Sequence, residues 1–213
     1  QRRIAYLCAK FGKRLIVATQ MLESMIENPV PTRAEVTDVA NAVFEQSDAI
    51  MLSGETSVGK YPVRSVETLI RIARRTENFP GVNFTEKLIK GNNGQHLAAS
   101  AIQIATNLKI RATVVITRNG RGAGYLSNLR PRQIGIYSFT NSPKVFTSMM
   151  LYRGVYPFLM ELQDNPEDTI QDALGILQKT EGFAAEEQVV VLANILTGDG
   201  YRTSLQIRSI PAA

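Results

Sequence analysis

Two hydroxyl side chains follow two short apolar segments of this sequence. Thr19 comes directly after the β-branched run Leu15 to Ala18, and Ser53 comes after Ile50 to Leu52. Short apolar runs of this kind are typical of buried parallel strands. Parallel strands end at one edge of their sheet, and ligands of α/β proteins bind at that edge. We therefore expect both hydroxyls to contribute to one polar site.

A second candidate site is the turn Thr117 to Gly122, with the sequence Thr-Arg-Asn-Gly-Arg-Gly. It follows a predicted strand and precedes a helix start, its glycines let backbone amides point inward, and it offers a hydroxyl and two guanidinium groups. This combination suits a phosphate group. The alternative is an ordinary strand-to-helix turn with solvated arginines. Leu196 to Gly200 is another glycine turn at a strand end, and it could face the first turn across the same crevice.

Four other residues give weaker signals. His96, the only histidine, stands beside a predicted helix start without a second metal ligand, so we expect an exposed capping residue and no metal site. Cys8 lies in an apolar helical pattern and is expected to pack against the core. Glu23 is either a carboxylate of the first site or a residue that complements a helix dipole. Arg33 is either solvated or a contact between subunits.

A capping box marks one of the helices that must position the two hydroxyls. The Thr32 hydroxyl can accept from the amide at the third helical position, while the Glu35 carboxylate reaches back to the cap. Apolar side chains then recur at helical spacing over residues 36–44, which predicts a core-facing helix. The next helix is predicted to begin at Pro62. Two successive strand–helix units do not make a domain, so their partner strands are missing.

Two more helices are predicted in the first part of the chain. The sequence opens on a helical pattern with Ile4, Leu7 and Cys8 on one face, and this start inside a helix indicates a fragment of a longer protein. After Thr19, apolar residues at helical spacing over residues 21–25 predict a helix directly behind the hydroxyl.

The second part of the chain has the pattern of a complete α/β domain. Periodicity lapses between about residues 78 and 95, which predicts a domain boundary there. Beyond it, a helix over about 95–108 and another that starts at Asn165–Pro166 accompany five predicted strands, the last of them antiparallel at an edge. The strands cover residues 113–116, 133–137, 154–157, 188–193 and 201–210.

Composition excludes several classes of protein. The net charge of +5 is spread along the chain with no basic stripe, so nucleic-acid binding is not expected. No apolar run reaches the roughly 20 residues of a membrane span. A single cysteine cannot form an internal disulfide, which favours a reducing compartment, and the cytoplasm is the expected location.

Three motifs of the first part resemble those of pyruvate kinase. They are Ala18-Thr-Gln-Met-Leu-Glu-Ser-Met25, Pro31-Thr-Arg-Ala-Glu35 with Asp38-Val-Ala-Asn-Ala-Val43, and Asp48-Ala-Ile-Met-Leu-Ser-Gly-Glu-Thr56 with Tyr61-Pro62. The second part is similar to the C-terminal domain of the same family through Thr117 to Gly122, Arg130-Pro-Arg132 and Leu151-Tyr-Arg-Gly154. The resemblance covers nearly the whole chain.

The resemblance implies an α/β fold in two parts. Residues 1–80 would be the C-terminal part of a (β/α)₈ barrel, with its last two strand–helix units. Residues 81–213 would be a three-layer α/β/α effector-binding domain with a mostly parallel five-stranded sheet. The family transfers the phosphoryl group of phosphoenolpyruvate to ADP in glycolysis, giving pyruvate and ATP, and it uses Mg²⁺ and K⁺. Its members are commonly homotetramers controlled by a phosphorylated effector.

The same resemblance assigns roles to individual residues. Thr19 matches a substrate-contacting threonine that helps deliver a proton to the enolate, and Ser53 matches a serine of the same hydroxyl and water network. Arg33 matches an arginine at a subunit contact. The effector phosphate would be clamped by Thr117, Arg118, Asn119, Gly120, Arg121 and Gly122.

Other parts of the family's pattern are missing from this sequence. The catalytic lysine and the ligands of Mg²⁺ and K⁺ belong to barrel strands upstream of these residues, so the chain alone is expected to be inactive. Asn119 and Gly122 stand where members regulated by a sugar bisphosphate often carry serine, which favours a sugar monophosphate or AMP over fructose 1,6-bisphosphate. The alternative function is a non-catalytic module that binds a phosphorylated metabolite or supports oligomerisation.

Overall fold

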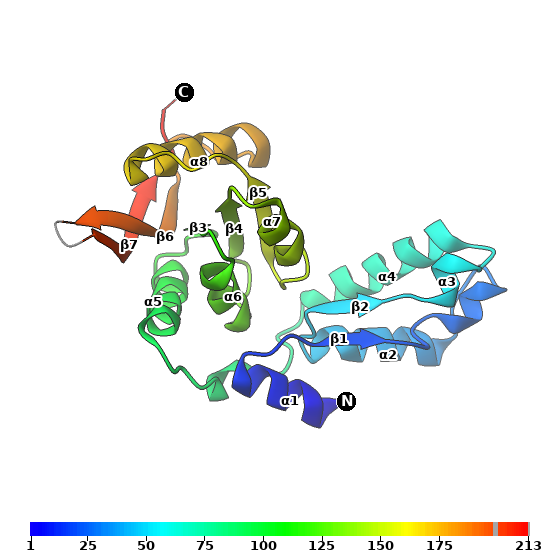
Figure 1. Cartoon of the computed structure of the whole chain (residues 1–213). Helices are drawn as coiled ribbons and strands as arrows, with labels where there is room; N and C mark the ends of the chain where they lie inside the picture. The colour runs from blue at the N-terminus through cyan, green and yellow to red at the C-terminus, as the bar shows by residue number, and fades with distance from the viewer. Residues whose placement is uncertain (198–199, 213) are drawn as a thin grey trace. The chain divides into compact units, whose positions relative to one another are not determined.

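The computed structural model describes residues 1–197 and 200–212, and the chain divides into two compact units, Gln1–Ile89 and Lys90–Ala213 (Figure 1). The first unit contains α1 (Arg2–Phe11), β1 (Ile16–Ala18), the 3-10 helix η1 (Glu23–Ile26), α2 (Arg33–Phe44), β2 (Ala49–Met51), α3 (Gly54–Ser57), α4 (Pro62–Glu77) and the 3-10 helix η2 (Phe84–Lys87). The second contains α5 (Asn93–Asn107), β3 (Ala112–Ile116), α6 (Arg121–Asn128), β4 (Gly135–Thr140), α7 (Pro143–Met149), β5 (Val155–Leu159), α8 (Pro166–Glu181), β6 (Gln188–Thr197) and β7 (Gly200–Ser209).

The first unit consists of two parallel strand–helix units, as the sequence predicts. β1 pairs with β2 from Ile16 opposite Ala49 to Ala18 opposite Met51. The predicted capping box starts α2, with both of its hydrogen bonds formed, and Pro62 is the first residue of α4. Their core gathers buried side chains from the loop after β1, from η1 and from α2: Met21, Leu22, Met25 and Val39.

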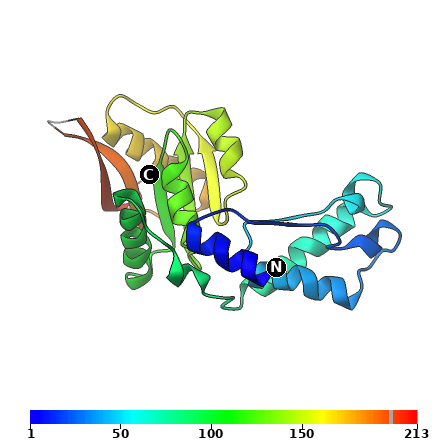
Figure 2. The same cartoon turned by 60° about the horizontal axis from the view of Figure 1, so that its bottom comes forward.

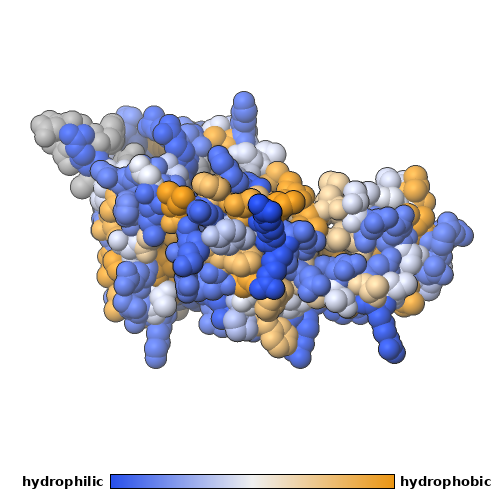
Figure 3. Space-filling model, turned by 90° about the horizontal axis from the view of Figure 1, so that it is seen from below, coloured by the Kyte–Doolittle hydropathy of each residue, from blue (hydrophilic) through white to orange (hydrophobic). Residues whose placement is uncertain are grey.

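One prediction for the first unit is wrong. No α-helix follows Thr19, because the chain turns there through two left-handed residues and then forms only the 3-10 helix η1. The helix predicted at the start of the chain is present as α1, and Cys8 on its predicted apolar face is half-buried. Ala5 and Ala9 are buried, since small side chains let the helix lie close to its neighbours, whereas Ile4 and Leu7 reach the surface. Figure 3 shows such hydrophobic side chains at the surface among hydrophilic ones.

The second unit is a five-stranded sheet covered by helices on both faces. The strand order is β5-β4-β3-β6-β7, and every pair is parallel except β6 with β7. Figure 2 shows the β6–β7 hairpin reaching beyond the other strands. The mostly parallel sheet and its antiparallel edge strand confirm the predicted fold class.

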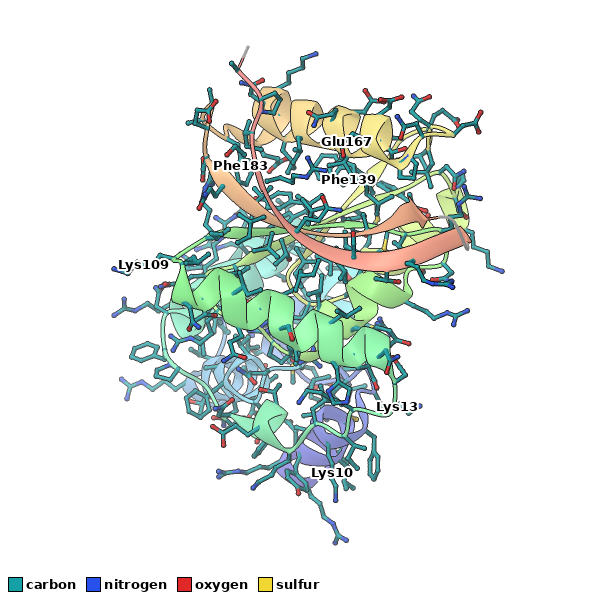
Figure 4. All side chains as sticks on the ribbon, turned by 90° about the vertical axis from the view of Figure 1, so that its left-hand side faces the viewer. Lys10, Lys13, Lys109, Phe139, Glu167 and Phe183 are labelled. Carbon is teal, nitrogen blue, oxygen red and sulfur yellow. The ribbon has the colours of Figure 1, made fainter. Side chains whose placement is uncertain are left out.

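Alternating side chains of the central strands build the two cores on either side of this sheet. Val114 packs against residues of α8, while its neighbour Val115 packs against α5 and α6. Figure 4 shows Phe139 and Phe183 between the sheet and α8. The Arg111 guanidinium lies 3.9 Å from the Phe183 ring centroid and is paired with Glu187. Both faces of the sheet are therefore covered, as a parallel sheet requires.

A proline interrupts the exposed edge of the sheet at β5. Pro157 pairs in register with Ser138 of β4. The Met160 amide donates to the Thr140 carbonyl on β4. Because amide directions alternate along a strand, the nitrogen of Pro157 faces away from β4, at a position where an edge strand tolerates proline.

Candidate functional site

Thr19 lies at the carboxyl end of β1 in a strained turn. Its φ is 69° and that of Gln20 is 54°, so two consecutive residues other than glycine adopt the left-handed conformation. Each such residue costs on the order of 1–3 kcal/mol, and the conformation is most unusual for a β-branched side chain. Met21 and Leu22 then enter the core, and the side chain of Thr19 remains exposed. Strain of this kind is concentrated at functional turns.

Ser53 lies at the same edge of the two-stranded sheet. The strands are paired up to Ala18 and Met51, so Thr19 and Ser53 stand one and two residues beyond the last pair. Both side chains are exposed. The sheet thus brings the two hydroxyl-bearing loops together at the edge where the sequence places them.

A buried carboxylate connects these two loops. Glu55 is only 3% exposed, and its two oxygens serve different partners. Oε1 accepts a hydrogen bond from the Leu22 amide at 2.9 Å, and Oε2 accepts one from the Ser53 amide at 2.8 Å. The sequence reasoning missed Glu55, although its place two residues after a strand-end serine was a usable signal.

A second carboxylate holds the loop that precedes α2. Glu35 accepts hydrogen bonds from the amide and hydroxyl of Ser24 at 2.7 and 2.6 Å and from the amide and hydroxyl of Thr32 at 2.7 and 2.9 Å. Burial alone would raise the pKa of Glu35, but these hydrogen bonds stabilise the ionised form and lower the pKa below its ordinary value. Arg33 is exposed at the first position of the same helix.

The remaining candidates of the first unit form no metal site. Glu23 is exposed in the first turn of η1, and Cys8 is a half-buried free thiol. Among the residues that the structure describes, no three His, Cys, Asp or Glu side chains come close enough to hold a metal ion. In the second unit, His96 is exposed within α5, where Asn92 rather than the histidine caps the helix.

The second unit contains a cavity of about 980 Å³ at the carboxyl end of β3, beside the middle of β6. Five of the six residues predicted to clamp a phosphate line it, and Gly120 does not. Residues of α5, of the segment before α8 and of β7 complete the wall. The lining residues are Asn92, Asn93, Gly94, Val115, Ile116, Thr117, Arg118, Asn119, Arg121, Gly122, Tyr125, Leu162, Gln163, Pro166, Thr169, Leu192, Ala193 and Thr203.

The wall of this cavity is electropositive. The first turns of α5, α6 and α8 all contribute lining residues, and helix N-termini carry partial positive charge and free amides. Arg118 and Arg121 add two full charges, while no acidic residue occurs among the described lining residues. Such a wall suits an anionic ligand.

The loop from Thr117 to Gly122 holds its own shape. The Gly120 amide donates to the Thr117 hydroxyl at 3.0 Å, and the Arg121 amide donates to the Asn119 side-chain oxygen at 3.1 Å. Gly120 has a φ of 74°, which favours glycine. A Cβ on Gly122 would lie 2.8 Å from Val115, so α6 rests directly on the sheet.

Several cavity residues were not singled out from the sequence. The segment Gly91 to Gly94 signalled only a domain boundary, yet Asn92 caps α5 and its amide nitrogen lies 3.4 Å from the Tyr125 hydroxyl. The Asn165–Pro166 cap predicted the start of α8 but not its place in the wall. The second glycine turn, Leu196 to Gly200, includes residues 198 and 199, which lie outside the described residues.

Comparison with protein families identifies both units. The model of the pyruvate kinase barrel domain matches residues 1–66, and that of the pyruvate kinase alpha/beta domain matches residues 95–207. Similar proteins include a chloroplastic pyruvate kinase isozyme G of Ricinus communis, 42% identical over 195 residues, and a pyruvate kinase of Sporosarcina psychrophila, 36% identical over 209 residues. They match 90% and 96% of this chain.

Solved structures show the same likeness. A crystal structure of a pyruvate kinase from Cryptosporidium parvum matches 99% of this chain with a TM-score of 0.88 at 28% identity, and a structure of the enzyme of that organism in complex with ADP matches with a TM-score of 0.86. The chain spans 46% and 36% of the two relatives and 42% of the first solved structure. The chain belongs to the pyruvate kinase family.

Proposed function

We propose that the full-length protein is a pyruvate kinase that transfers the phosphoryl group of phosphoenolpyruvate to ADP, yielding pyruvate and ATP in glycolysis. Residues 1–80 form part of its catalytic barrel and residues 81–213 its effector-binding domain. The observation that carries this proposal is the strained, exposed Thr19 beside Ser53 at one strand edge, in a chain whose two parts match the two domains of the family.

In this proposal the two hydroxyls act on the substrate. Thr19 hydrogen-bonds phosphoenolpyruvate and helps deliver a proton to the enolate, and Ser53 belongs to the hydroxyl and water network around it. By the family's pattern, the Mg²⁺ and K⁺ that stabilise phosphoryl transfer are held by barrel strands of the full-length protein outside this chain.

The catalytic proposal is tested by a coupled assay of the full-length protein. Pyruvate formation is followed through lactate dehydrogenase with phosphoenolpyruvate, ADP, Mg²⁺ and K⁺. We expect turnover by the full-length protein and none by residues 1–213 alone. A full-length protein without turnover under these conditions would reject the assignment.

A second candidate function rests on the electropositive cavity. We propose that it binds a phosphorylated metabolite, with a sugar monophosphate or AMP favoured over fructose 1,6-bisphosphate. Calorimetric titration of the chain with glucose 6-phosphate, AMP and fructose 1,6-bisphosphate tests this directly. Arg121→Ala should weaken the effector response while basal activity changes little, and Arg132→Ala, an exposed residue outside the wall, is its control. Binding without turnover in the full-length protein would favour a non-catalytic module.

Assembly and location complete the proposal. A homotetramer in which Arg33 contacts a neighbouring subunit is the expected assembly, and sedimentation of the full-length protein and its Arg33→Ala variant would test it. None of the helices in the described part combines the length and apolar composition of a membrane span. The expected cytoplasmic location stays a prediction, since several relatives are named chloroplastic.

A further inference from the structure

The carboxylate of Glu55 is the one described group that hydrogen-bonds both loops beyond the strand ends of the first unit. It reaches back from the second position of α3 to the Ser53 amide and across to Leu22, 33 residues away in sequence. Neither oxygen serves both loops, so both oxygens are needed to hold them together.

The bond to Leu22 closes the turn that presents Thr19. Thr19 and Gln20 are left-handed, a conformation that residues other than glycine hold only when the surroundings impose it. Two constraints act immediately after them. The side chain of Leu22 is fully buried, and its amide is bound to Glu55. Releasing that amide would leave only the burial of Met21 and Leu22 to constrain the strained pair, and the turn could relax.

The bond to Ser53 fixes the second hydroxyl relative to the first. Ser53 is the cap residue of α3, and its amide is bound by the same carboxylate that binds Leu22. Displacement of one loop would therefore be transmitted to the other through a side chain that is 97% buried, with little room to rearrange. The geometry indicates that Glu55 supports both loops together rather than each loop being held independently.

We propose that Glu55 is a positioning residue for the phosphoryl-transfer site, because it sets the Thr19 hydroxyl and the Ser53 loop in one fixed relation. This inference rests on the proposed pyruvate kinase function. Glu55 acts through Thr19. Its role is to supply two hydrogen-bond acceptors, one to each loop, and it does not contact the substrate.

Substitution separates the two oxygens. Glu55→Gln keeps one acceptor and turns the other into a donor that faces an amide, so one loop is released. Misplacement of a reacting group by about 1 Å costs on the order of 100-fold in rate, so we expect kcat of the full-length enzyme to fall about 10- to 100-fold. The KM for phosphoenolpyruvate should stay within about threefold if the loss is confined to the transition state. Glu27→Gln, an exposed carboxylate paired with Lys60, is the matched control and should retain full activity.

A double-mutant cycle with Thr19→Ala distinguishes positioning from a general structural role. If Glu55 acts through Thr19, Glu55→Gln will have little further effect once the hydroxyl is gone. Hydrogen exchange should accelerate in peptides that contain Leu22 and Ser53, with α4 unchanged. Additive losses in the cycle, or unchanged exchange at both amides, would overturn the proposal.

The controls separate failure of this inference from failure of the proposed function. If the wild-type protein shows no turnover, the proposed function is rejected. If the wild type is active and Glu55→Gln is fully active too, only the inference about Glu55 is rejected. If Glu55→Gln shows no cooperative thermal transition, Glu55→Asp, which retains two acceptor oxygens on a shorter arm, replaces it in the cycle. Unfolding of both variants would assign Glu55 a purely structural role and overturn the proposal.

Discussion

The two units of the chain fasten their strand-end loops by different means. In the first unit a buried carboxylate holds two loops at once, and the turn at Thr19 is strained. In the second unit the loop after β3 is closed by its own Thr117 and Asn119, and its backbone is left-handed only at Gly120. A loop that supplies its own hydrogen bonds can be preformed without its neighbours. A loop fixed through a distant side chain is correct only when the whole edge is in place.

Removing the hydroxyl of Thr19 tests whether the strained turn of the first unit serves catalysis, and it should have the largest effect. General acid–base groups contribute about 100- to 10,000-fold, so Thr19→Ala should lower kcat of the full-length protein by at least about 100-fold. The coupled assay measures it. Thr37→Ala, which removes an exposed hydroxyl bonded to its own helix, should retain wild-type activity. A Thr19→Ala variant with wild-type kcat would remove the functional reason for the strain.

A core truncation asks whether the units are independent. Leu174 is fully buried under the sheet of the second unit, so Leu174→Ala should destabilise that unit by about 2–5 kcal/mol. Hydrogen exchange read by peptide should show the loss in residues 90–213, with the first unit unaffected. Leu159→Ala, at an exposed edge position, should cost less than about 0.5 kcal/mol. Equal loss of protection in both units would show that they unfold as one, and the comparison would fail.

Alanine substitutions at two glycines of the second unit, one in the crowded loop region and one in open space, test how closely α6 packs on the sheet. Gly122→Ala places a Cβ 2.8 Å from Val115, so α6 must lift from the sheet at a cost of about 1–3 kcal/mol. Gly175 in α8 has open space around it, so Gly175→Ala should stabilise the chain by about 0.5–1 kcal/mol. Urea denaturation of both variants measures the difference. Effects of the same sign would contradict the close packing of α6.

The smallest effect is expected from pH. The pKa of Glu35 is lowered below its ordinary value of 4.5, so the folded state binds this proton less readily than the unfolded state. Its contribution is complete above that value and is lost as pH falls below it. Glu35→Gln should cost less than about 1 kcal/mol at pH 7 and flatten the acid limb of the stability curve. Glu67→Gln on α4 is the exposed control, and parallel pH curves for wild type and Glu35→Gln would contradict the assignment.

Local chemistry explains which parts of this structure the sequence predicted. Capping residues and helical spacing placed α2, α4 and α8 because both signals lie within a few adjacent residues. The helix α7 was missed, although Ser142 caps it and Pro143 occupies its first turn. The turn at Thr19 was misread as helical because apolar spacing does not report a left-handed backbone. The position of Glu55 after Ser53 was a usable local signal, but its bond to Leu22 and that of Tyr125 to Asn92 each join residues 33 positions apart, which spacing along the sequence does not reveal.

The proline in β5 bears on the tendency of the protein to aggregate at high protein concentration. An open sheet edge is a template on which another chain can add a strand, and the edge at β5 carries the exposed apolar side chains of Tyr156 and Leu159. Between them Pro157 withholds an outward donor and fixes the local backbone. A strand from another chain that pairs with this edge would lack one backbone hydrogen bond at Pro157, so this residue disfavours aggregation through the edge.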